Sequence, residues 1–337
     1  MNDTPLILGF ETSCDETAVA VVRGGTVLSN VAATQVDEHA RFGGVVPEVA
    51  ARAHVEAIRS LAHRALRDAG VHPMDLDAVA ATKGPGLAGA LMVGFSYGKA
   101  LAWALDVPFI GVDHMEGHLF APRFENPDYE PPAVVLLASG GHSEIVHLRG
   151  WGDYEVLGAT IDDAAGEAFD KLARFLGLGY PGGPAIDRES EGGDPTVVAF
   201  PRALPDRPID LSFSGLKTAV TTYVRFHHGA GDLPPMADLT AAIQEAIVDA
   251  LVTKTMNAVT AVRAPAVAGG GGVLANRRLR QRLADECAAA GVALYLPSPA
   301  LCTDNGAMIA AAAVFRLARG EVASLDAEID SSMRLGA

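Results

Sequence analysis

Short apolar runs separated by turns predict a chain built from two similar α/β halves. Aliphatic runs bounded by Gly, Pro and polar residues predict strands, and longer stretches with a helical period predict helices. In the first half the predicted elements are three strands, a helix, a strand, a helix and a strand, at residues 6–11, 17–22, 27–34, 47–69, 77–82, 87–105 and 108–113. The second half begins with three predicted strands, at residues 133–139, 143–150 and 154–160, which are followed by an insertion at about 161–235. After the insertion we predict a helix, a strand, a helix, a strand and a helix, at residues 236–262, 265–270, 274–290, 292–297 and 304–319. We interpret each half as one copy of a βββαβαβα unit.

A duplicated unit of this order resembles the one used by the actin, Hsp70 and sugar kinase superfamily, which holds a nucleotide in a cleft between two lobes. We therefore expect an α/β fold with an N-terminal actin-like lobe at 1–130, a C-terminal actin-like lobe at 131–325 and a tail at 326–337. Two unrelated α/β domains are the alternative. The length of 337 residues suits either arrangement, because single cores usually stop growing near about 250 to 300 residues.

Composition favours a cytoplasmic protein without a membrane partner. Cys14, Cys287 and Cys302 are too few and too scattered for a disulfide framework or a Cys-X-X-Cys zinc site. The first apolar run follows no basic segment, so it predicts a strand and not a signal peptide. The most apolar stretch, 86–105, contains Lys99 and many small residues, which predicts a packed helix and not a membrane span.

The net charge of −15 argues against general nucleic-acid binding, because affinity for phosphate needs clustered Lys and Arg. A local patch is the exception to consider. The stretch "RRLRQR" at 277–282 has four arginines in six residues, and a solvated helix face is its more common meaning.

The stretch "HMEGH" carries the candidate metal ligands. On a helix, His114 and His118 are one turn apart, so both imidazoles can reach one ion. A zinc protease has this spacing but places its catalytic glutamate directly after the first histidine, where this chain has Met115. Glu116 lies about 200° round the helix from His114 and should point away from the ion. The sequence therefore keeps His114 and His118 as candidate metal ligands but has no glutamate in the position of the protease base.

A third ligand is expected from "CTDNGAMIA" at 302–310. Asp304, at the start of the last predicted helix of the second half, would complete a site of two histidines and one carboxylate with open positions for substrate. An aspartate at this position is also a good helix N-cap, which is the alternative role.

Two turns are candidates for holding a phosphate. In "ASGGHSE" at 138–144, Ser139, Gly140 and Gly141 would let the backbone approach a ligand closely, although an ordinary hairpin turn explains the glycines equally well. The matching turn at 11–17 is acidic, which favours either a cation or a ligand with few phosphates.

Two further glycine-rich segments are candidates for binding a nucleoside. The stretch at 267–280 passes through four glycines into a helix, and Asn276 in it can hydrogen-bond to ribose or base. The stretch at 179–187 ends in Asp187, a possible acceptor for a ribose hydroxyl.

Nine motifs in order resemble the catalytic subunit of the tRNA threonylcarbamoyladenosine synthases, a family once described as sialoglycoprotein endopeptidases. They are "GFETSCDET", "GPGLAGALMVG", "HMEGHL", "LASGGHSEI", "GEAFDK", "GYPGGPAID", "SFSGLKTAV", "GGGGVLANRRLR" and "CTDNGAMIA". The resemblance extends from about Leu6 to Asp330. It implies transfer of a threonylcarbamoyl group from threonylcarbamoyl-AMP to the exocyclic amine of the adenosine 3′ of the anticodon, in tRNAs reading codons that begin with A.

The resemblance also implies the site residues and partners. The metal ligands would be His114, His118 and Asp304, holding one divalent ion, with Fe²⁺ expected and Zn²⁺, Mg²⁺ or Mn²⁺ left open. The residues binding the acyl adenylate would be Leu137, Ala138, Ser139, Gly140, Gly141, Asp170, Gly183, Asp187 and Asn276. The implied partners are tRNA, a shorter paralogue without the metal site and a small P-loop ATPase.

For the catalytic base we consider Glu11, with a structural or metal-facing role as its alternative. Three other functions stay open at this point. A small-molecule kinase would share the fold and phosphorylate a metabolite, a metallopeptidase would cleave proteins, and a nucleotide-binding switch would leave tRNA unchanged.

Overall fold

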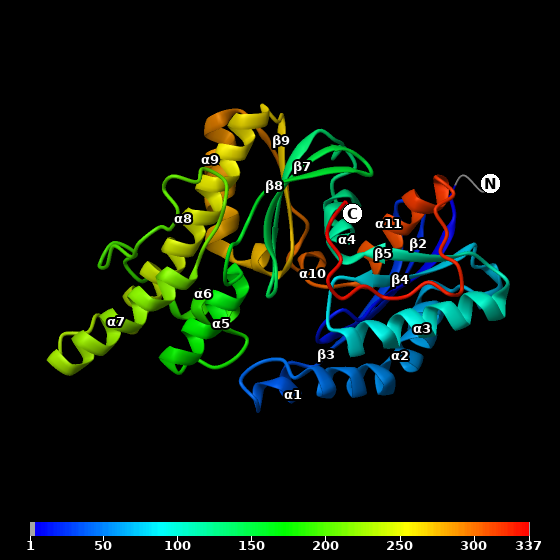
Figure 1. Ribbon diagram of the computed structural model, residues 1–337, viewed down its shortest axis with the longest axis horizontal. Coiled ribbons are helices and arrows are strands. Elements are labelled where there is room, and N and C mark those ends of the chain that lie inside the picture. The colour runs from blue at the N-terminus through cyan, green and yellow to red at the C-terminus, as the bar shows by residue number, and fades with distance from the viewer. Residues whose placement is uncertain (1–3, 337) are drawn as a thin grey trace. The chain divides into compact units, whose positions relative to one another are not determined.

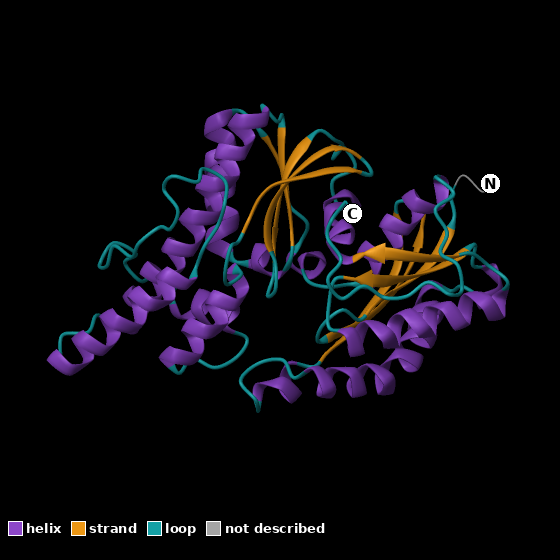
Figure 2. Cartoon of the chain, in the orientation of Figure 1, coloured by secondary structure: helices purple, strands orange, loops and turns teal. Residues whose placement is uncertain are grey.

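The computed structural model describes residues 4–336, and the chain folds into two compact units (Figures 1 and 2). One unit runs up to Tyr129 and takes in the chain again from Asp304, and the other is Glu130–Thr303. The second unit is therefore inserted into the sequence of the first.

The first unit contains a five-stranded sheet in the order β3-β2-β1-β4-β5. The strands are β1 (Leu6–Glu11), β2 (Glu16–Arg23), β3 (Thr26–Thr34), β4 (Ala78–Gly84) and β5 (Phe109–Asp113). The helices are α1 (Val36–Ala40), α2 (Pro47–Ala69), α3 (Ala88–Leu105), α4 (His114–Phe120) and α11 (Gly306–Ala318), with short 3₁₀ turns at Pro73–Asp75 and Ala121–Phe124. β1 runs antiparallel to β2 and parallel to β4.

β1 is covered on both faces, which explains why its six residues are all buried. Side chains alternate between the two faces of a strand. Leu6, Leu8 and Phe10 join the hydrophobic core that contains residues of α2 and α3, whereas Gly9 faces α11. In Figure 1, α2 and α3 cover one face of this sheet and α11 covers the other.

The second unit repeats the same topology with a sheet in the order β10-β9-β6-β7-β8. Its strands are β6 (Ala133–Ala138), β7 (Ser143–Gly150), β8 (Asp153–Ala159), β9 (Ala266–Gly270) and β10 (Ala293–Tyr295). Its helices are α5 (Ala165–Leu176), α6 (Gly182–Glu189), α7 (Ser214–Ala230), α8 (Met236–Val262), α9 (Arg277–Ala290) and α10 (Pro299–Cys302), with a 3₁₀ turn at Gly272–Ala275. The predicted duplication of a strand-rich α/β unit is confirmed.

The insertion at 161–235, which the sequence left without assigned elements, forms α5, α6 and α7. These helices belong to the core of the second unit, because apolar residues from each join its buried cluster: Phe169, Leu172, Ile186, Leu216 and Val220. The insertion is therefore a helical part of the unit and not a separate domain.

α11 packs on the sheet of the first unit, which differs from the expected lobe boundary at residue 325. A Cβ at Gly9 would lie 2.6 Å from the carbonyl oxygen of Gly306, and a Cβ at Gly306 would lie 2.5 Å from the Ala20 nitrogen. Only glycine permits the helix and the strands to approach this closely. Sequence order suggested the second half, but the close contact at these two glycines holds α11 in the first unit.

The tail after α11 also packs on the first unit. The Ala323 N–H donates to the carbonyl of Phe109, and the Asp330 N–H donates to the carbonyl of Lys83. The ammonium of Lys99 on α3 donates to the carbonyl of Ala327 at 2.8 Å. The end of β4, the start of β5 and helix α3 thus bind the tail.

α3 corresponds to the most apolar stretch of the sequence. Leu91, Phe95 and Ala102 are buried against the sheet, whereas Met92 and Trp103 are exposed. Among residues 4–336, no helix combines the length and the hydrophobicity that crossing a membrane requires.

Candidate active site

α4 begins directly where β5 ends, and its start is fixed by Asp113. One carboxylate oxygen of Asp113 accepts hydrogen bonds from the N–H groups of Met115 at 2.7 Å and Glu116 at 3.2 Å, which caps the helix. Every residue of this short helix is buried. His114 and His118 therefore stand one turn apart on a buried helix that follows β5 directly and contacts α11.

The two histidines and Asp304 converge as the sequence predicted. Oδ1 of Asp304 lies 3.5 Å from Nε2 of His114 and 3.2 Å from Nε2 of His118. The three ligand atoms all lie within 4.8 Å of one another. Metal bonds of about 2.1 Å at angles of about 90° to 110° place donor atoms about 3.0 to 3.4 Å apart, and the two distances from Asp304 to the histidines are close to this range.

The alternative role of Asp304 as the N-cap of the last helix is wrong. Asn305 occupies the N-cap of α11, and its side-chain oxygen accepts from the N–H of Met308 at 3.0 Å. The Asp304 side chain is 19% exposed and is turned toward the histidines. Because Asp304 belongs to the first unit, all three ligands come from one compact unit.

His118 provides the strongest test of whether the residues fit a metal. Its side chain is completely buried, and within residues 4–336 neither of its ring nitrogens has a hydrogen-bond partner. Nε2 is near Asp304, but the geometry is not that of a hydrogen bond. Buried polar atoms normally have partners, so a shared cation accounts for this pair better than a direct contact.

Glu11 supports His114 from the side away from Asp304. One carboxylate oxygen of Glu11 accepts from Nδ1 of His114 at 2.9 Å and from the hydroxyl of Thr82 at 2.6 Å. The other oxygen accepts from the N–H of Ser13, whose hydroxyl lies 3.3 Å from Nδ1 of His114. A hydrogen on Nδ1 leaves the lone pair on Nε2, which is the arrangement that metal-binding histidines need. This geometry supports the alternative role that the sequence left open for Glu11.

The local electrostatics favour a positive charge beside His114. Burial opposes a charge on His114, but the carboxylates of Glu11 and Asp304 outweigh it and raise the pKa of His114 to about 10. Burial likewise opposes the charge of Glu11, yet His114 holds the pKa of Glu11 below its usual value. A metal cation bound to Nε2 of His114 would balance the negative charge of the same two carboxylates. The donor atoms and the negative charge around them therefore both fit a divalent ion.

The acidic turn at 11–17 carries less charge than its sequence suggests. Burial raises the pKa of Glu16 to about 8, and the neighbouring carboxylates of Asp304, Asp15 and Glu11 add to the shift. Burial also raises the pKa of the Cys14 thiol, which is therefore neutral. At neutral pH the turn repels an anionic substrate less than three ionised carboxylates would.

A buried hydrogen-bond network holds this turn in place. Nε2 of His54 donates to the carbonyl of Cys14 at 3.0 Å, so Nδ1 accepts, from the hydroxyl of Thr17 at 2.7 Å and the amide of Gln35 at 3.3 Å. The amide oxygen of Gln35 accepts from Nε2 of His39 at 3.1 Å. Each partner fits a neutral His54. A proton on its Nδ1 would face the NH₂ group of Gln35 and would require the Thr17 hydroxyl to turn from donor to acceptor.

The network predicts that acid removes the stability that neutral His54 contributes. Burial lowers the pKa of His54, whereas an unfolded histidine titrates near about 6.5. The unfolded state therefore binds more protons at His54 below that pH, and the contribution of His54 to the free energy of unfolding should fall as pH decreases from about 7 to about 5, by up to about 1.4 kcal/mol per unit. The raised pKa of Glu16 acts in the opposite direction over this range, so the difference between wild type and a His54 variant isolates the contribution of His54. Denaturant titrations of wild type and His54→Gln would measure this.

The variant should be less stable at neutral pH and should lose part of the pH dependence. His63→Gln, at an exposed position on the same helix, is the matched control and should follow wild type. Parallel pH profiles for wild type and His54→Gln would contradict the prediction.

In the second unit, the predicted phosphate turn lies at the end of β6. The Ser139 N–H donates to the carbonyl of His142 at 2.8 Å, which closes the turn. Gly140 and Gly141 are exposed, and a Cβ at either would meet no atom within 4 Å. A Cβ at Gly166, in the first turn of α5, would lie 2.5 Å from the Ser139 oxygen. The turn thus presents open backbone on one side and packs on α5 on the other.

Asp170 on α5 holds the second glycine-rich segment. Its carboxylate accepts from the N–H of Gly182 at 2.6 Å, at the start of α6. Gly183 has no atom within 4 Å of an added Cβ. The structure therefore connects Asp170 to the 179–187 segment. Of the other residues expected to bind the acyl adenylate, Leu137 and Ala138 are buried in β6.

Asn276 and Asp187 are engaged with other protein groups. The Asn276 side chain caps α9 by accepting from the N–H of Leu279 at 2.9 Å, and it donates to Gln244 at 2.7 Å. Asp187 accepts from the guanidinium of Arg277 at 2.7 Å. These bonds fix the positions of both side chains.

The strands bring the glycine-rich run to the phosphate turn. β6 and β9 are parallel neighbours, with Leu137 opposite Gly270, so their carboxyl ends meet at one edge of the sheet. Gly271 has φ +96°, and a Cβ there would lie 2.3 Å from the Ala138 oxygen. The segments expected to bind phosphate and nucleoside are therefore adjacent.

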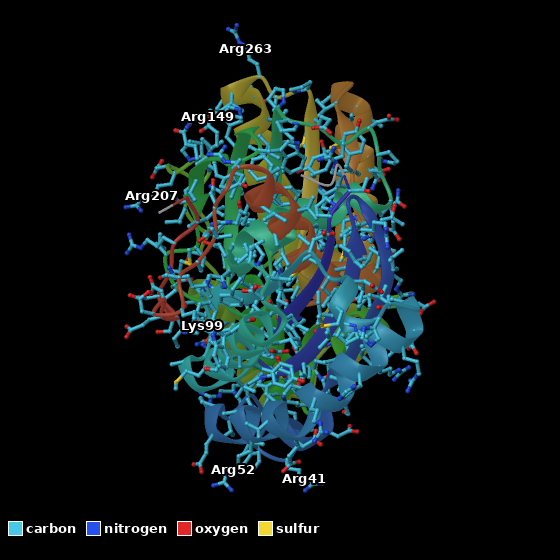
Figure 3. All side chains as sticks on the ribbon, turned by 90° about the vertical axis from the view of Figure 1, so that its right-hand side faces the viewer. Arg41, Arg52, Lys99, Arg149, Arg207 and Arg263 are labelled. Carbon is cyan, nitrogen blue, oxygen red and sulfur yellow. The ribbon has the colours of Figure 1, made fainter. Side chains whose placement is uncertain are left out.

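The arginines of "RRLRQR" have partners within the protein, which favours a structural role for this patch. Arg278 donates to both oxygens of Glu245, and Arg282 contacts Glu245 and Asp249. Arg280 donates to the carbonyl of Leu274. With Arg277 on Asp187, all four side chains are used on the second unit. Other cations lie on separate elements, as the six labelled in Figure 3 illustrate: Arg41, Arg52, Lys99, Arg149, Arg207 and Arg263.

The sequence did not predict the roles of Ser13 and Thr82 around Glu11. β1 and β4 were both predicted as strands, and Glu11 and Thr82 stand near their carboxyl ends. The missing information was that β1 and β4 are parallel neighbours, which places the ends of the two strands together.

Two solved structures resemble the chain throughout its length. Component A of (R)-2-hydroxyglutaryl-CoA dehydratase from Acidaminococcus fermentans has a TM-score of 0.54 at 15% identity, covering 94% of this chain and 99% of that chain. Full-length HypF in its phosphate- and nucleotide-bound form has a TM-score of 0.62 at 14% identity, covering 96% of this chain and 48% of that chain. At these identities the similarity shows the fold alone, and it confirms the duplicated actin-like architecture.

Sequence relatives are much closer. A Clostridium perfringens protein named tRNA N6-adenosine threonylcarbamoyltransferase is 47% identical to this chain over 336 residues, which cover 99% of each chain. A Magnetococcus marinus protein of the same name is 52% identical over 330 residues, which cover 94% of this chain and 93% of the relative. The family model described as tRNA N6-adenosine threonylcarbamoyltransferase matches residues 26–311. The chain belongs to the tRNA N6-adenosine threonylcarbamoyltransferase family.

Proposed function

We propose that the protein transfers the threonylcarbamoyl group of threonylcarbamoyl-AMP to the exocyclic amine of the adenosine 3′ of the anticodon, in tRNAs reading codons that begin with A. AMP is the leaving group. The observation that carries this proposal is the buried cluster of His114, His118 and Asp304 supported by Glu11, in a chain of this tRNA-modifying family. A kinase needs no such cluster, and a protease of the "HMEGH" type would need a base where Met115 stands.

His114, His118 and Asp304 would hold one divalent ion, with Fe²⁺ proposed and Zn²⁺, Mg²⁺ or Mn²⁺ as alternatives. Bound there, the ion supplies Lewis-acid stabilisation of charge that develops on the carbamoyl oxygen. Glu116 takes no part as a base, because its carboxylate accepts from the guanidinium of Arg316 at 2.6 Å. We assign Glu11 a positioning role in place of the base role, since it holds the proton on Nδ1 of His114.

In the second unit we propose that the residues binding the acyl adenylate are Leu137, Ala138, Ser139, Gly140, Gly141, Asp170, Gly183, Asp187 and Asn276. The open backbone at Gly140 and Gly141 supports phosphate binding there. The bonds of Asp170 to Gly182 and of Asp187 to Arg277 support a rigid pocket wall.

The proposed partners are tRNA, a shorter paralogue without the metal site and a small P-loop ATPase, all in the cytoplasm. A net charge of −15 and the internal use of the "RRLRQR" arginines leave little general attraction for RNA. Partner subunits that recruit tRNA are consistent with both observations.

Transfer of labelled threonine into anticodon-loop adenosine tests the function. The reaction would contain the full chain, its partner subunits, synthetic threonylcarbamoyl-AMP and unmodified tRNA. Labelled tRNA is the expected product. Phosphorylation of a metabolite, cleavage of a protein, or nucleotide binding with unlabelled tRNA would each support a different function and contradict this one.

Gly140→Val tests the phosphate turn separately from the metal. The new side chain meets no protein atom at its Cβ, so the variant should fold normally, but it occupies the space through which the phosphate would approach the backbone. We expect KM for threonylcarbamoyl-AMP to rise at least about tenfold, equivalent to about 1.4 kcal/mol of binding. Gly25→Val, at an equally open hairpin turn in the first unit, should leave KM unchanged. Equal KM values for the two variants would show that the turn does not bind substrate.

A further inference from the structure

A partly buried ion pair joins the two helices that bring the metal ligands together. Oε2 of Glu116 on α4 accepts from Nε of Arg316 on α11 at 2.6 Å. The Glu116 side chain is 3% exposed and that of Arg316 is 24% exposed. α4 carries His114 and His118, and Asp304 stands two residues before the start of α11. The pair therefore connects the two parts of the metal site at a distance from the ligands.

The position of this pair is not explained by stability alone. Removing a carboxylate and a guanidinium from water is costly, and an apolar pair of similar size often stabilises a protein equally well. What an ion pair adds is direction, because the guanidinium and carboxylate must meet in a restricted geometry. A directional contact between two helices specifies how far one is shifted along the other.

Gly117 and Phe120 on α4 also make apolar contacts with α11. Gly117 lets the helices approach, since a Cβ there would lie 3.0 Å from Cδ1 of Ile309 and 3.1 Å from Cγ of Met308. The rings of Phe120 and Phe315 have centroids 5.8 Å apart. These contacts restrict how closely α4 and α11 approach, and the ion pair adds a directional restraint at another point along the two helices.

We propose that Glu116 and Arg316 form a positioning pair that sets the register of α11 against α4 and so holds Asp304 at the distance from His114 and His118 that a divalent ion requires. This role rests on the proposed metal site. It differs from the role of Glu11, which acts on the ring of His114. Glu116 and Arg316 bind one another, and Arg316 also lies 3.5 Å from Glu321, so we assign both a positioning role.

The test is the affinity of the full chain for Co²⁺, measured by the visible absorption of the bound ion. Glu116→Gln and Arg316→Met should each weaken Co²⁺ binding about 10- to 100-fold, the usual effect of losing a group that orients a metal ligand. The melting temperature of the metal-free protein is the second measurement. Arg278→Met, which breaks the pair with Glu245 in the second unit, is the matched control and should leave Co²⁺ affinity unchanged.

The double variant Glu116→Met with Arg316→Met separates positioning from stability. An apolar pair should recover the melting temperature of the metal-free protein, because no charge is left buried without a partner. It should not recover Co²⁺ affinity, because the directional contact is absent. Variants that melt at lower temperature but bind Co²⁺ as tightly as wild type would overturn the positioning role.

Failure of the metal site itself would look different. If wild type and His114→Ala bound Co²⁺ equally, the proposed ligands would be wrong and the positioning role would fall with them. If wild type bound one Co²⁺ that His114→Ala lost, while Glu116→Gln and Arg316→Met bound normally, only the positioning role would be wrong.

Discussion

Replacing His114 or Asp304 with alanine is expected to abolish transfer of the threonylcarbamoyl group to tRNA. Each change removes one of three ligands, and the loss should exceed the roughly 10- to 100-fold effect of disturbing a group that only orients a ligand. We therefore expect at least about a 1000-fold loss of kcat/KM, about 4 kcal/mol of transition-state stabilisation. Labelled threonine transfer and metal content measured on the same preparations would check both effects.

His63→Ala, at an exposed site on α2, should retain both transfer and metal and serves as the control. Glu11→Gln adds a distinction between the two roles considered for Glu11. A positioning role predicts that metal affinity and transfer fall together, whereas a base role predicts lost transfer with the metal retained. Full transfer by His114→Ala with no bound metal would refute the proposed chemistry.

Gly9→Ala is expected to cause a large loss of stability, because it adds a methyl group between β1 and α11. The added Cβ would lie 2.6 Å from the Gly306 oxygen and 2.8 Å from the Ala310 nitrogen, both backbone atoms that no side-chain rotation can move. Overpacking a core usually costs about 1 to 3 kcal/mol, and this site should lie at about 3 kcal/mol because strand and helix must separate. Denaturant unfolding would measure the loss.

The same substitution should weaken metal binding, because α11 follows Asp304 directly and would be displaced. Gly25→Ala is the matched control, since a Cβ at this turn has no atom within 4 Å. A Gly9→Ala protein as stable as Gly25→Ala would mean that the sheet and α11 can separate at little cost.

The sequence predicted the elements well where hydrophobic periodicity alone decides them. β1, α2 and α8 have the expected bounds, and both sheets have the expected meanders. It did not predict which unit would take α11, because that depends on the absence of side chains at Gly9 and Gly306. A missing methyl group leaves no periodic signal, so long-range packing of this kind is not visible in one sequence.

The site shows the same limit. Spacing predicted the histidine pair and excluded Glu116 as a base, and the structure brings Asp304 to both histidines. The interactions of Asn276 with Gln244 and of Asp187 with Arg277 connect residues far apart in sequence, so a local sequence pattern cannot predict them.

The insertion of Glu130–Thr303 into the first unit has a consequence for biosynthesis. When the ribosome has made the segment that contains His114 and His118, the chain still lacks Asp304 and α11, and one face of β1 has no cover. The whole second unit must be translated before the first can close. The proposed metal site would therefore be completed late. A chain that ends anywhere in the second unit would contain the two histidines but not the carboxylate that completes the site.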